Sequence, residues 1–236
     1  MIKANSFLKR AGQNILSYND KIDFVMKARD ENRLSQLATH DDPEIRDIVA
    51  SLTQDENTLE QLAGDPDPEI RAKAKTRIVR TIKNQDLLLQ FLEDESYQVR
   101  YAAAKLIQNK DILKQLVTDE SSSVRSLVAE RIQDEDILSQ LATDENFLVR
   151  KAVVQNTQNE NILSQLATDK SFNVRQEVAR KTKNEKLLEQ MELNDRNEGV
   201  RFIAKKRLQE LHSSPKIANL SKTVNLFYKT VQASYN

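Results

Sequence analysis

Residues 65–71 read Asp-Pro-Asp-Pro-Glu-Ile-Arg, and the Ile-Arg pair that ends this stretch belongs to a series. Seven Ile-Arg or Val-Arg pairs stand at successive spacings of 25, 29, 25, 25, 25 and 26 residues. The arginines of these pairs are Arg46, Arg71, Arg100, Arg125, Arg150, Arg175 and Arg201. A fixed period in this range is typical of a stacked repeat array. The sequence therefore predicts the architecture before it indicates a function.

The residues around each arginine predict a short amphipathic helix. The residue before it is Ile or Val and the residue three after it is a small apolar one, which places both on one helical face. Four residues before the arginine stands a residue type that favours the N-cap, where a side-chain oxygen accepts a hydrogen bond from a first-turn amide. The predicted caps are Asp42, Asp67, Ser96, Ser121, Asn146, Ser171 and Asn197.

A second helix is predicted in each repeat. Its N-caps are Asp55, Asn84, Asn109, Asp134, Asn159 and Asn184, each followed by Leu, Ile or Phe at helical spacing. It ends near an aspartate six residues before the next arginine, a place that His40 holds in the first copy. A 25-residue unit leaves open whether this helix is α or 3₁₀. The four extra residues of the 29-residue spacing equal about one helical turn, so the first helix lengthens without rotating its apolar face.

We therefore expect an all-α fold, a right-handed α-solenoid of about seven 25-residue, two-helix repeats with helical caps, because neither helix buries its apolar face alone. Residues 1–32 would form an N-terminal helical cap, residues 33–210 the array and residues 211–236 a C-terminal capping helix, all in one structural domain. In the last segment Ser214-Pro215 begins an amphipathic pattern whose polar face carries lysines. That helix would fold onto the last repeat, bind a partner, or lie on a membrane surface.

The stretches at 65–71 and 138–144 (Leu-Ser-Gln-Leu-Ala-Thr-Asp) resemble the leucine-rich repeat variant, a bacterial α-solenoid family, and the short HEAT-like repeats of many bacterial scaffolds. The resemblance covers roughly residues 30–210 and implies a binding scaffold. Two features depart from the family pattern. The Asn-Pro and Thr-Pro steps typical of the variant are absent between the helices, and the Cys-rich cluster segment of some members has no counterpart in a chain without cysteine.

Composition argues against an enzyme. The lack of Cys excludes thiolate metal sites and Cys nucleophiles, and the two histidines, His40 and His212, lie at opposite ends of the array. No phosphate-binding loop, nucleophile elbow or zinc-protease motif occurs. We expect no catalytic residue, no metal and no cofactor. No apolar run approaches the ~20 residues that span a bilayer, and no secretory segment begins the chain, so we expect a cytoplasmic protein.

Charge is unevenly distributed along the chain although the net charge is zero. Residues 35–200 carry 22 Lys and Arg against 31 Asp and Glu, whereas residues 1–34 and 201–236 are basic. An acidic array is a poor electrostatic match for a phosphate backbone, so we do not expect a nucleic-acid partner. Contact with a membrane is expected at most through the basic C-terminal helix.

Two sets of side chains are candidates for a role beyond the core. The seven arginines either form a phosphate-binding strip or pair with the aspartates that end the second helices; we favour a structural ladder, because the guanidinium fork matches a carboxylate bidentately. Positions that vary between repeats are candidates for partner binding: Tyr97, Tyr101, Phe147, Lys151, Phe172 and Phe202. These aromatic residues either form an exposed contact ridge or pack as staples against the preceding turn.

The resulting hypothesis is a non-enzymatic scaffold that binds a protein or peptide on one face of the array. Two alternatives stay open. One is a nucleic-acid-binding protein similar to the HEAT-like alkylpurine glycosylases, and the other is a HEAT-like lyase or chaperone, which rests on analogy of fold alone.

Overall fold

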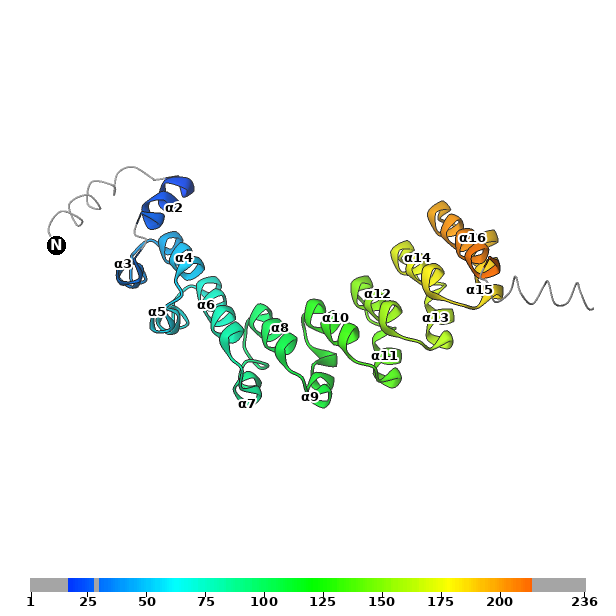
Figure 1. The fold of residues 1–236 in the computed structure, drawn as a ribbon, viewed down its shortest axis with the longest axis horizontal. Helices are drawn as coiled ribbons and strands as arrows, with labels where there is room; N and C mark the ends of the chain where they lie inside the picture. Colours follow the sequence, from blue (N-terminus) through cyan, green and yellow to red (C-terminus); the bar gives the residue numbers. More distant parts are fainter. Residues whose placement is uncertain (1–16, 28–29, 214–236) are drawn as a thin grey trace, which may run out of the picture. The chain divides into compact units, whose positions relative to one another are not determined.

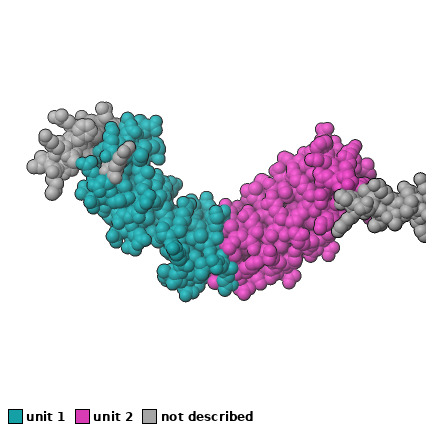
Figure 2. Space-filling view, viewed as in Figure 1, with its two compact units in different colours: residues 1–109 teal, residues 110–236 magenta. Residues whose placement is uncertain are grey.

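The computed structural model describes residues 17–27 and 30–213, and every regular element in these ranges is a helix. The chain divides into two compact units, residues 1–109 and 110–236, which are coloured separately in Figure 2. Within each unit short helices alternate with short turns (Figure 1). The predicted all-α repeat architecture is confirmed for the described part of the chain.

In the first unit, a first and a second helix alternate. The first helices are α2 (Tyr18–Met26), α4 (Pro43–Leu52), α6 (Pro68–Thr81) and α8 (Tyr97–Leu106). The second helices are α3 (Glu31–Leu37), α5 (Glu56–Leu62) and α7 (Gln85–Leu89). As predicted, the long spacing lengthens α6 to 14 residues, against 10 in α4 and α8.

The second unit continues the same order. Its first helices are α10 (Ser122–Arg131), α12 (Phe147–Asn156), α14 (Phe172–Lys181) and α16 (Glu198–His212). Its second helices are α9 (Lys110–Lys114), α11 (Glu135–Leu141), α13 (Glu160–Leu166) and α15 (Glu185–Asn194). Among the described residues, the 3₁₀ form is limited to η1 (Gln115–Thr118), which continues α9.

The helix starts lie where the cap pattern predicts them, and the seven first helices that carry the ladder arginines each begin one residue after the predicted N-cap. Four caps accept the expected bond from a first-turn amide: Asp42, Asp67, Asn146 and Asn197. The expected bond is absent at the three serines, Ser96, Ser121 and Ser171. The aspartate two residues earlier accepts the backbone N–H of the cap residue at 2.7 to 2.9 Å, at these serines and equally at Asp67, Asn146 and Asn197.

Stacking of the first helices forms the core. In the second unit α12 packs between α10 and α14, and α14 packs on α16. In every repeat the Ile or Val before the arginine and the small apolar residue three after it are buried. Because full burial of one such aliphatic side chain contributes ~1.5–3 kcal/mol, the repeats stabilise each other mainly through this face.

Helices α2 and α3 have the layout of a further repeat. Ser17 caps α2, and Lys21 stands four residues later, where the other repeats have arginine. Its Nζ lies 2.7 Å from Asp42 Oδ2 and 2.9 Å from Glu44 Oε2. The segment predicted as an N-terminal cap therefore contributes a helix of the array type.

Parts of the two predicted caps lie outside the described residues. This holds for residues 1–16 and for residues 214–236, which include the predicted C-terminal amphipathic pattern. Helix α16 itself extends to His212 and so includes the start of the segment assigned to the C-terminal cap. Within the described ranges, no helix combines the length and the apolar content needed to cross a membrane.

Candidate partner-binding surface

One local rule places the seven ladder arginines. Nη1 of each donates to the backbone carbonyl six residues earlier, at 2.7 to 2.9 Å. That carbonyl lies in the turn that leads into the arginine's own helix. Each guanidinium is therefore oriented by its own repeat through Nη1, and Nε and Nη2 can serve contacts with other groups.

Arg150 shows what that edge binds. Nε donates to Asp169 Oδ2 at 2.6 Å, and Nη2 donates to Asp169 Oδ1 at 2.8 Å. Asp169 also accepts the backbone N–H of Ser171, and its carbonyl accepts Arg175 Nη1. Both side chains of the pair are only 5% exposed. Arg150 thus joins its own turn to the next repeat, and Arg175 continues the chain of bonds.

The same bidentate pair joins Arg46 to Asp65, Arg125 to Asp144 and Arg175 to Asp195. Burial acts to raise the pKa of each of these carboxyl groups. The hydrogen bonds from the arginine and from a backbone amide outweigh burial, and the pKa lies below its ordinary value. These carboxylates stay charged at neutral pH, and each occupies a guanidinium edge that a phosphate would need.

Arg71 departs from the expected pairing with the acid six residues before the next arginine. Its Nε and Nη2 donate to Glu95 Oε1 at 3.2 and 2.8 Å, while Asp94 pairs with Lys75 Nζ at 2.7 Å. The cause is the four-residue insertion in α6, which moves the acid from 19 to 23 residues beyond the arginine. The Glu95 side chain is 62% exposed, so solvent screens this pair.

Arg100 and Arg201 complete the set. Arg100 donates from Nη1 to the Asp94 and Glu95 carbonyls at 2.8 and 3.2 Å. Arg201 donates to the Asp195 carbonyl at 2.8 Å. Within the described residues, Nε and Nη2 of Arg201 have no hydrogen-bond or ion-pair partner.

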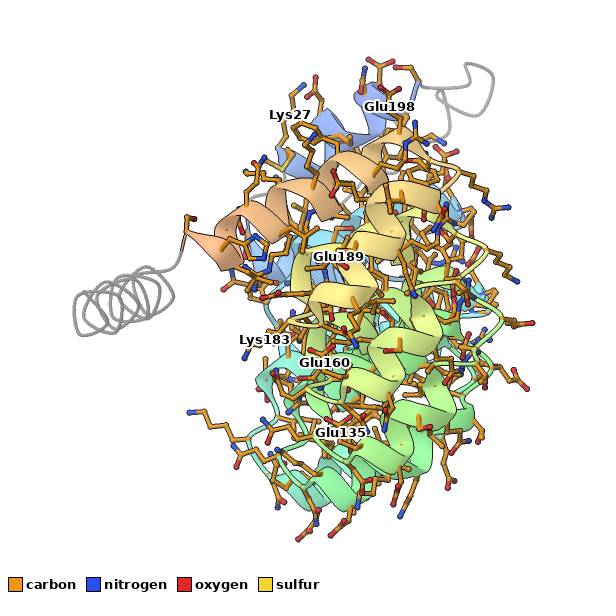
Figure 3. All side chains as sticks on the ribbon, turned by 90° about the vertical axis from the view of Figure 1, so that its right-hand side faces the viewer. Lys27, Glu135, Glu160, Lys183, Glu189 and Glu198 are labelled. Atoms are coloured by element: carbon orange, nitrogen blue, oxygen red, sulfur yellow. The ribbon has the colours of Figure 1, made fainter. Side chains whose placement is uncertain are left out.

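A second contact between repeats was missed from the sequence. Thr157, which ends α12, donates from Oγ1 to Glu135 Oε2 at 2.5 Å, and the backbone N–H of Gln158 donates to Glu135 Oε1 at 3.1 Å. The same contact joins Thr53 to Glu31 and Thr182 to Glu160. Glu135 and Glu160, labelled in Figure 3, begin α11 and α13. Both oxygens of each carboxylate are engaged, which marks the threonine–glutamate contact as structural.

The signal for this contact is a threonine 22 residues after a glutamate, in three repeats. At the end of the other first helices stand Ile82, Ile107 and Ile132, which have no hydroxyl to donate. Comparing the residue that follows each first helix would have separated the repeats with threonine there from those with isoleucine.

Three of the candidate aromatic residues lie on consecutive first helices. Phe147 and Phe172 are the first residues of α12 and α14 and are 38% and 46% exposed, and Phe202 in α16 is 66% exposed. Leu148 is also exposed, and Lys151, one turn after Phe147, is half-buried. We call these five residues the first-helix surface. Because α12, α14 and α16 pack side by side, their exposed apolar groups lie on neighbouring helices.

The remaining two candidates belong to the first unit. Tyr97 is the first residue of α8 and is exposed, and Tyr101, one turn later on the same helix, is half-buried. They form a separate aromatic pair of that unit.

Charge differs between the two rows of helices in the second unit. Helices α12, α14 and α16 carry nine Lys and Arg and three Glu, whereas α11, α13 and α15 carry one Lys and six acids. Arg150 and Arg175 are committed to the ladder, but Arg180, Lys205 and Lys206 are exposed. The acidic average of the repeats therefore conceals a basic row of first helices.

The described residues contain no group of three or more potential metal ligands. His40 Nδ1 accepts the backbone N–H of Asp42 at 3.0 Å, and His212 lies on the surface, 3.4 Å from Glu185. A shallow hollow beside α14 and α15 is lined by Met191, Arg175 and Asp195, but the last two already bind each other.

Neither a family model nor a curated protein matches this chain. Among solved structures, "a leucine-rich repeat variant with a novel repetitive protein structural motif" is similar with a TM-score of 0.58 and 24% identity, over 87% of this chain and 85% of that one. An engineered protein also matches, with a TM-score of 0.48 and 17% identity over 81% of this chain and 70% of that one. A structure of "computationally designed armadillo repeat proteins for modular peptide recognition" matches with a TM-score of 0.26 and 18% identity over 76% of this chain and 90% of that one. The chain has the helical repeat fold of the leucine-rich repeat variant.

Proposed function

We propose that this protein is a non-enzymatic scaffold that binds a protein or peptide on the first-helix surface. The observation that carries the proposal is the recurrence of exposed apolar side chains, Phe147, Phe172 and Phe202, on three consecutive packed helices. Single exposed apolar residues are ordinary, but a row of them on one face is typical of an interaction site. Partly buried aromatic side chains also dominate the energetics of protein interfaces.

The framework beneath this surface supports the proposal. Ladder pairs and threonine–glutamate contacts fix α12 and α14 to their neighbours from both ends of each helix. A surface that is rigid before binding loses little conformational entropy when a partner docks.

The basic character of the first-helix row indicates an acidic partner. Lys151 lies beside Phe147 on α12, and the exposed cations Arg180 and Lys206 lie on the following two first helices. A peptide with apolar side chains and interspersed Asp or Glu would match both features. Binding should therefore weaken as salt increases.

The test is a selection of random peptides, displayed on phage, against the full chain, followed by anisotropy titrations of the enriched peptides. The triple variant Phe147→Ser, Phe172→Ser, Phe202→Ser should weaken binding about tenfold or more. The matched control is Leu87→Ser, which changes an exposed leucine of α7 in the other unit and should leave binding unchanged.

Two results would contradict the proposal. One is unchanged peptide binding by the triple variant at an unchanged melting temperature. The other is a single-stranded oligonucleotide that displaces the peptides, which would assign the basic row to nucleic acid.

A further inference from the structure

Arg201 lies at the end of the ladder with its binding edge open. Nη1 is held at 2.8 Å from the Asp195 carbonyl, as in every other repeat. In Arg125, Arg150 and Arg175, the Nε and Nη2 edge holds the carboxylate of the following repeat at 2.6 to 3.0 Å. In Arg201 the same edge has no partner within residues 17–27 and 30–213.

We propose that Arg201 is a binding site for a carboxylate of a partner protein, presented by an aspartate that closes the turn at the start of a helix. The three filled copies of the site define this ligand. In each, the aspartate binds the guanidinium with both oxygens and accepts a backbone N–H two residues later. A guanidinium that is already oriented binds a planar carboxylate at little additional entropic cost.

The last repeat is not built to receive another repeat of the same kind. Lys205 is exposed at the position where Ala129, Val154 and Ala179 are fully buried in the preceding repeats. Its Nζ lies 3.8 Å from Glu192 Oε1. Glu192 stands where the earlier repeats have a buried alanine, Ala142 after α11 and Ala167 after α13. A polar outer face of this kind is typical of a terminal repeat. The open site is therefore expected to take a partner through charge rather than through continued apolar stacking.

Apolar contact area accompanies the charge on this helix pair. Leu193 near the end of α15 and Phe202 next to Arg201 are the two most exposed large apolar side chains of the described residues. Arg and aromatic residues are enriched at interface centres, so the exposed Phe202 beside Arg201 supports a contact surface on this helix pair.

Two segments of the chain lack the acidic side chains that this site would bind. Residues 211–236 contain no Asp or Glu, and neither do residues 1–19. The position six before Lys21, which corresponds to the ladder aspartates, is Ile15. Because the repeat pattern of the chain itself has an apolar residue at this position, we assign the site to a different protein. This inference shares Phe202 with the first-helix surface but does not depend on Phe147 or Phe172.

The test uses the full chain labelled with ¹⁵N and a synthetic peptide of residues 160–181 as the probe, because this segment presents Asp169 in the required turn. The Arg201 Nε–H signal, assigned by its loss in Arg201→Lys, should shift as the peptide is added, while the Arg150 and Arg175 signals stay in place. The matched probe Asp169→Asn should bind about tenfold more weakly, because it cannot form the charged bidentate pair. Lys186→Ala, which changes an exposed cation of the neighbouring helix α15, should leave the titration unchanged.

Equal binding of the two peptides, or a titration unaffected by Arg201→Lys, would overturn the site. Sedimentation velocity of the full chain tests whether a second copy fills the site. A dimer of the full chain that dissociates in Arg201→Ala would show that a second copy fills the site and would overturn the assignment to a different protein.

Discussion

The two units use the same arginine at the same place, but one arginine of the first unit binds a different acid. In the second unit Arg125, Arg150 and Arg175 each bind an aspartate with both oxygens, and both partners are buried. In the first unit Arg46 does the same with Asp65, whereas Arg71 turns to an exposed glutamate. The difference follows from one extra helical turn in α6.

Each repeat must keep two features in register, the apolar face of its first helix and the ion pair of its arginine, and the insertion affects them differently. An insertion of four residues keeps the apolar face of a helix in place, because four residues make about one turn. It does not keep the ion pair of the arginine in place, because the turn that carries the partner aspartate then lies four residues farther from the arginine along the chain. Lys75, one turn after Arg71, takes the aspartate that the arginine no longer reaches. Apolar packing thus tolerates the insertion, and the charges rearrange around it.

Acid should have the largest effect, because it acts on all buried pairs together. The ladder aspartates have a lowered pKa in the folded chain, so the stability they provide is complete above the unfolded value near 4 and is lost as the pH falls through the folded values. The free energy of unfolding by urea should therefore be flat from neutral pH to about pH 5 and decrease steadily below about pH 4.

Two variants sharpen this comparison. Asp169→Asn should lower the plateau and flatten the acid limb, whereas Glu95→Gln should change neither by much. An acid limb that depends equally on both residues would show that the buried and exposed pairs are equivalent.

Removal of one buried arginine should have the next largest effect. Arg150→Ala leaves Asp169 charged and buried, which should lower the free energy of unfolding by about 3–5 kcal/mol. Arg71→Ala removes an exposed pair and should cost at most about 1 kcal/mol. Urea unfolding of both variants measures the difference. Equal losses would contradict the distinction between the units.

The threonine–glutamate contact should contribute less. Thr157→Val removes the hydroxyl that binds Glu135 and should cost about 1–2 kcal/mol, while the Gln158 amide still holds the other oxygen. The double variant Thr157→Ile, Glu135→Gln imitates the repeat in which Ile107 follows α8 and Gln85 accepts the Gln108 N–H, and it should recover part of the loss. Thermal melting compares the two, and a double variant less stable than Thr157→Val would refute this interpretation.

The helix caps should give the smallest effect. Asn146→Ala removes a side-chain bond to the Leu148 amide and should cost about 1 kcal/mol. Ser171→Ala removes no cap bond and should cost less than about 0.5 kcal/mol. The two positions are equivalent in consecutive repeats, so identical melting temperatures would show that the turn aspartate alone fixes both helix starts.

Most of the fold could be predicted from the sequence because its signals are local and recur. Asp and Asn caps, the Ile or Val before each arginine and the extra turn of α6 all act within one helix, and the structure confirms each of them. At the three serine caps the predicted side-chain bond is absent, which residue type alone does not reveal.

Contacts between repeats were harder to predict because they depend on three-dimensional register. Lys75 pairs with Asp94 because the insertion in α6 changes the spacing between Arg71 and the turn that carries Asp94. The contact of Thr157 with Glu135 joins residues from different repeats. For the candidate surface, the sequence indicated which positions vary. Only burial separates an open ring such as Phe202 from a half-buried one such as Tyr101.

The central claim is that the buried Arg–Asp ladder holds adjacent repeats together and that the exposed pair of the first unit does not. A pair of double-mutant cycles, Arg150→Ala with Asp169→Ala and Arg71→Ala with Glu95→Ala, tests it by urea unfolding at neutral pH. We predict a coupling free energy of about 2 kcal/mol or more for the buried pair and below about 1 kcal/mol for the exposed pair. Equal coupling in both cycles, or none between Arg150 and Asp169, would contradict the claim.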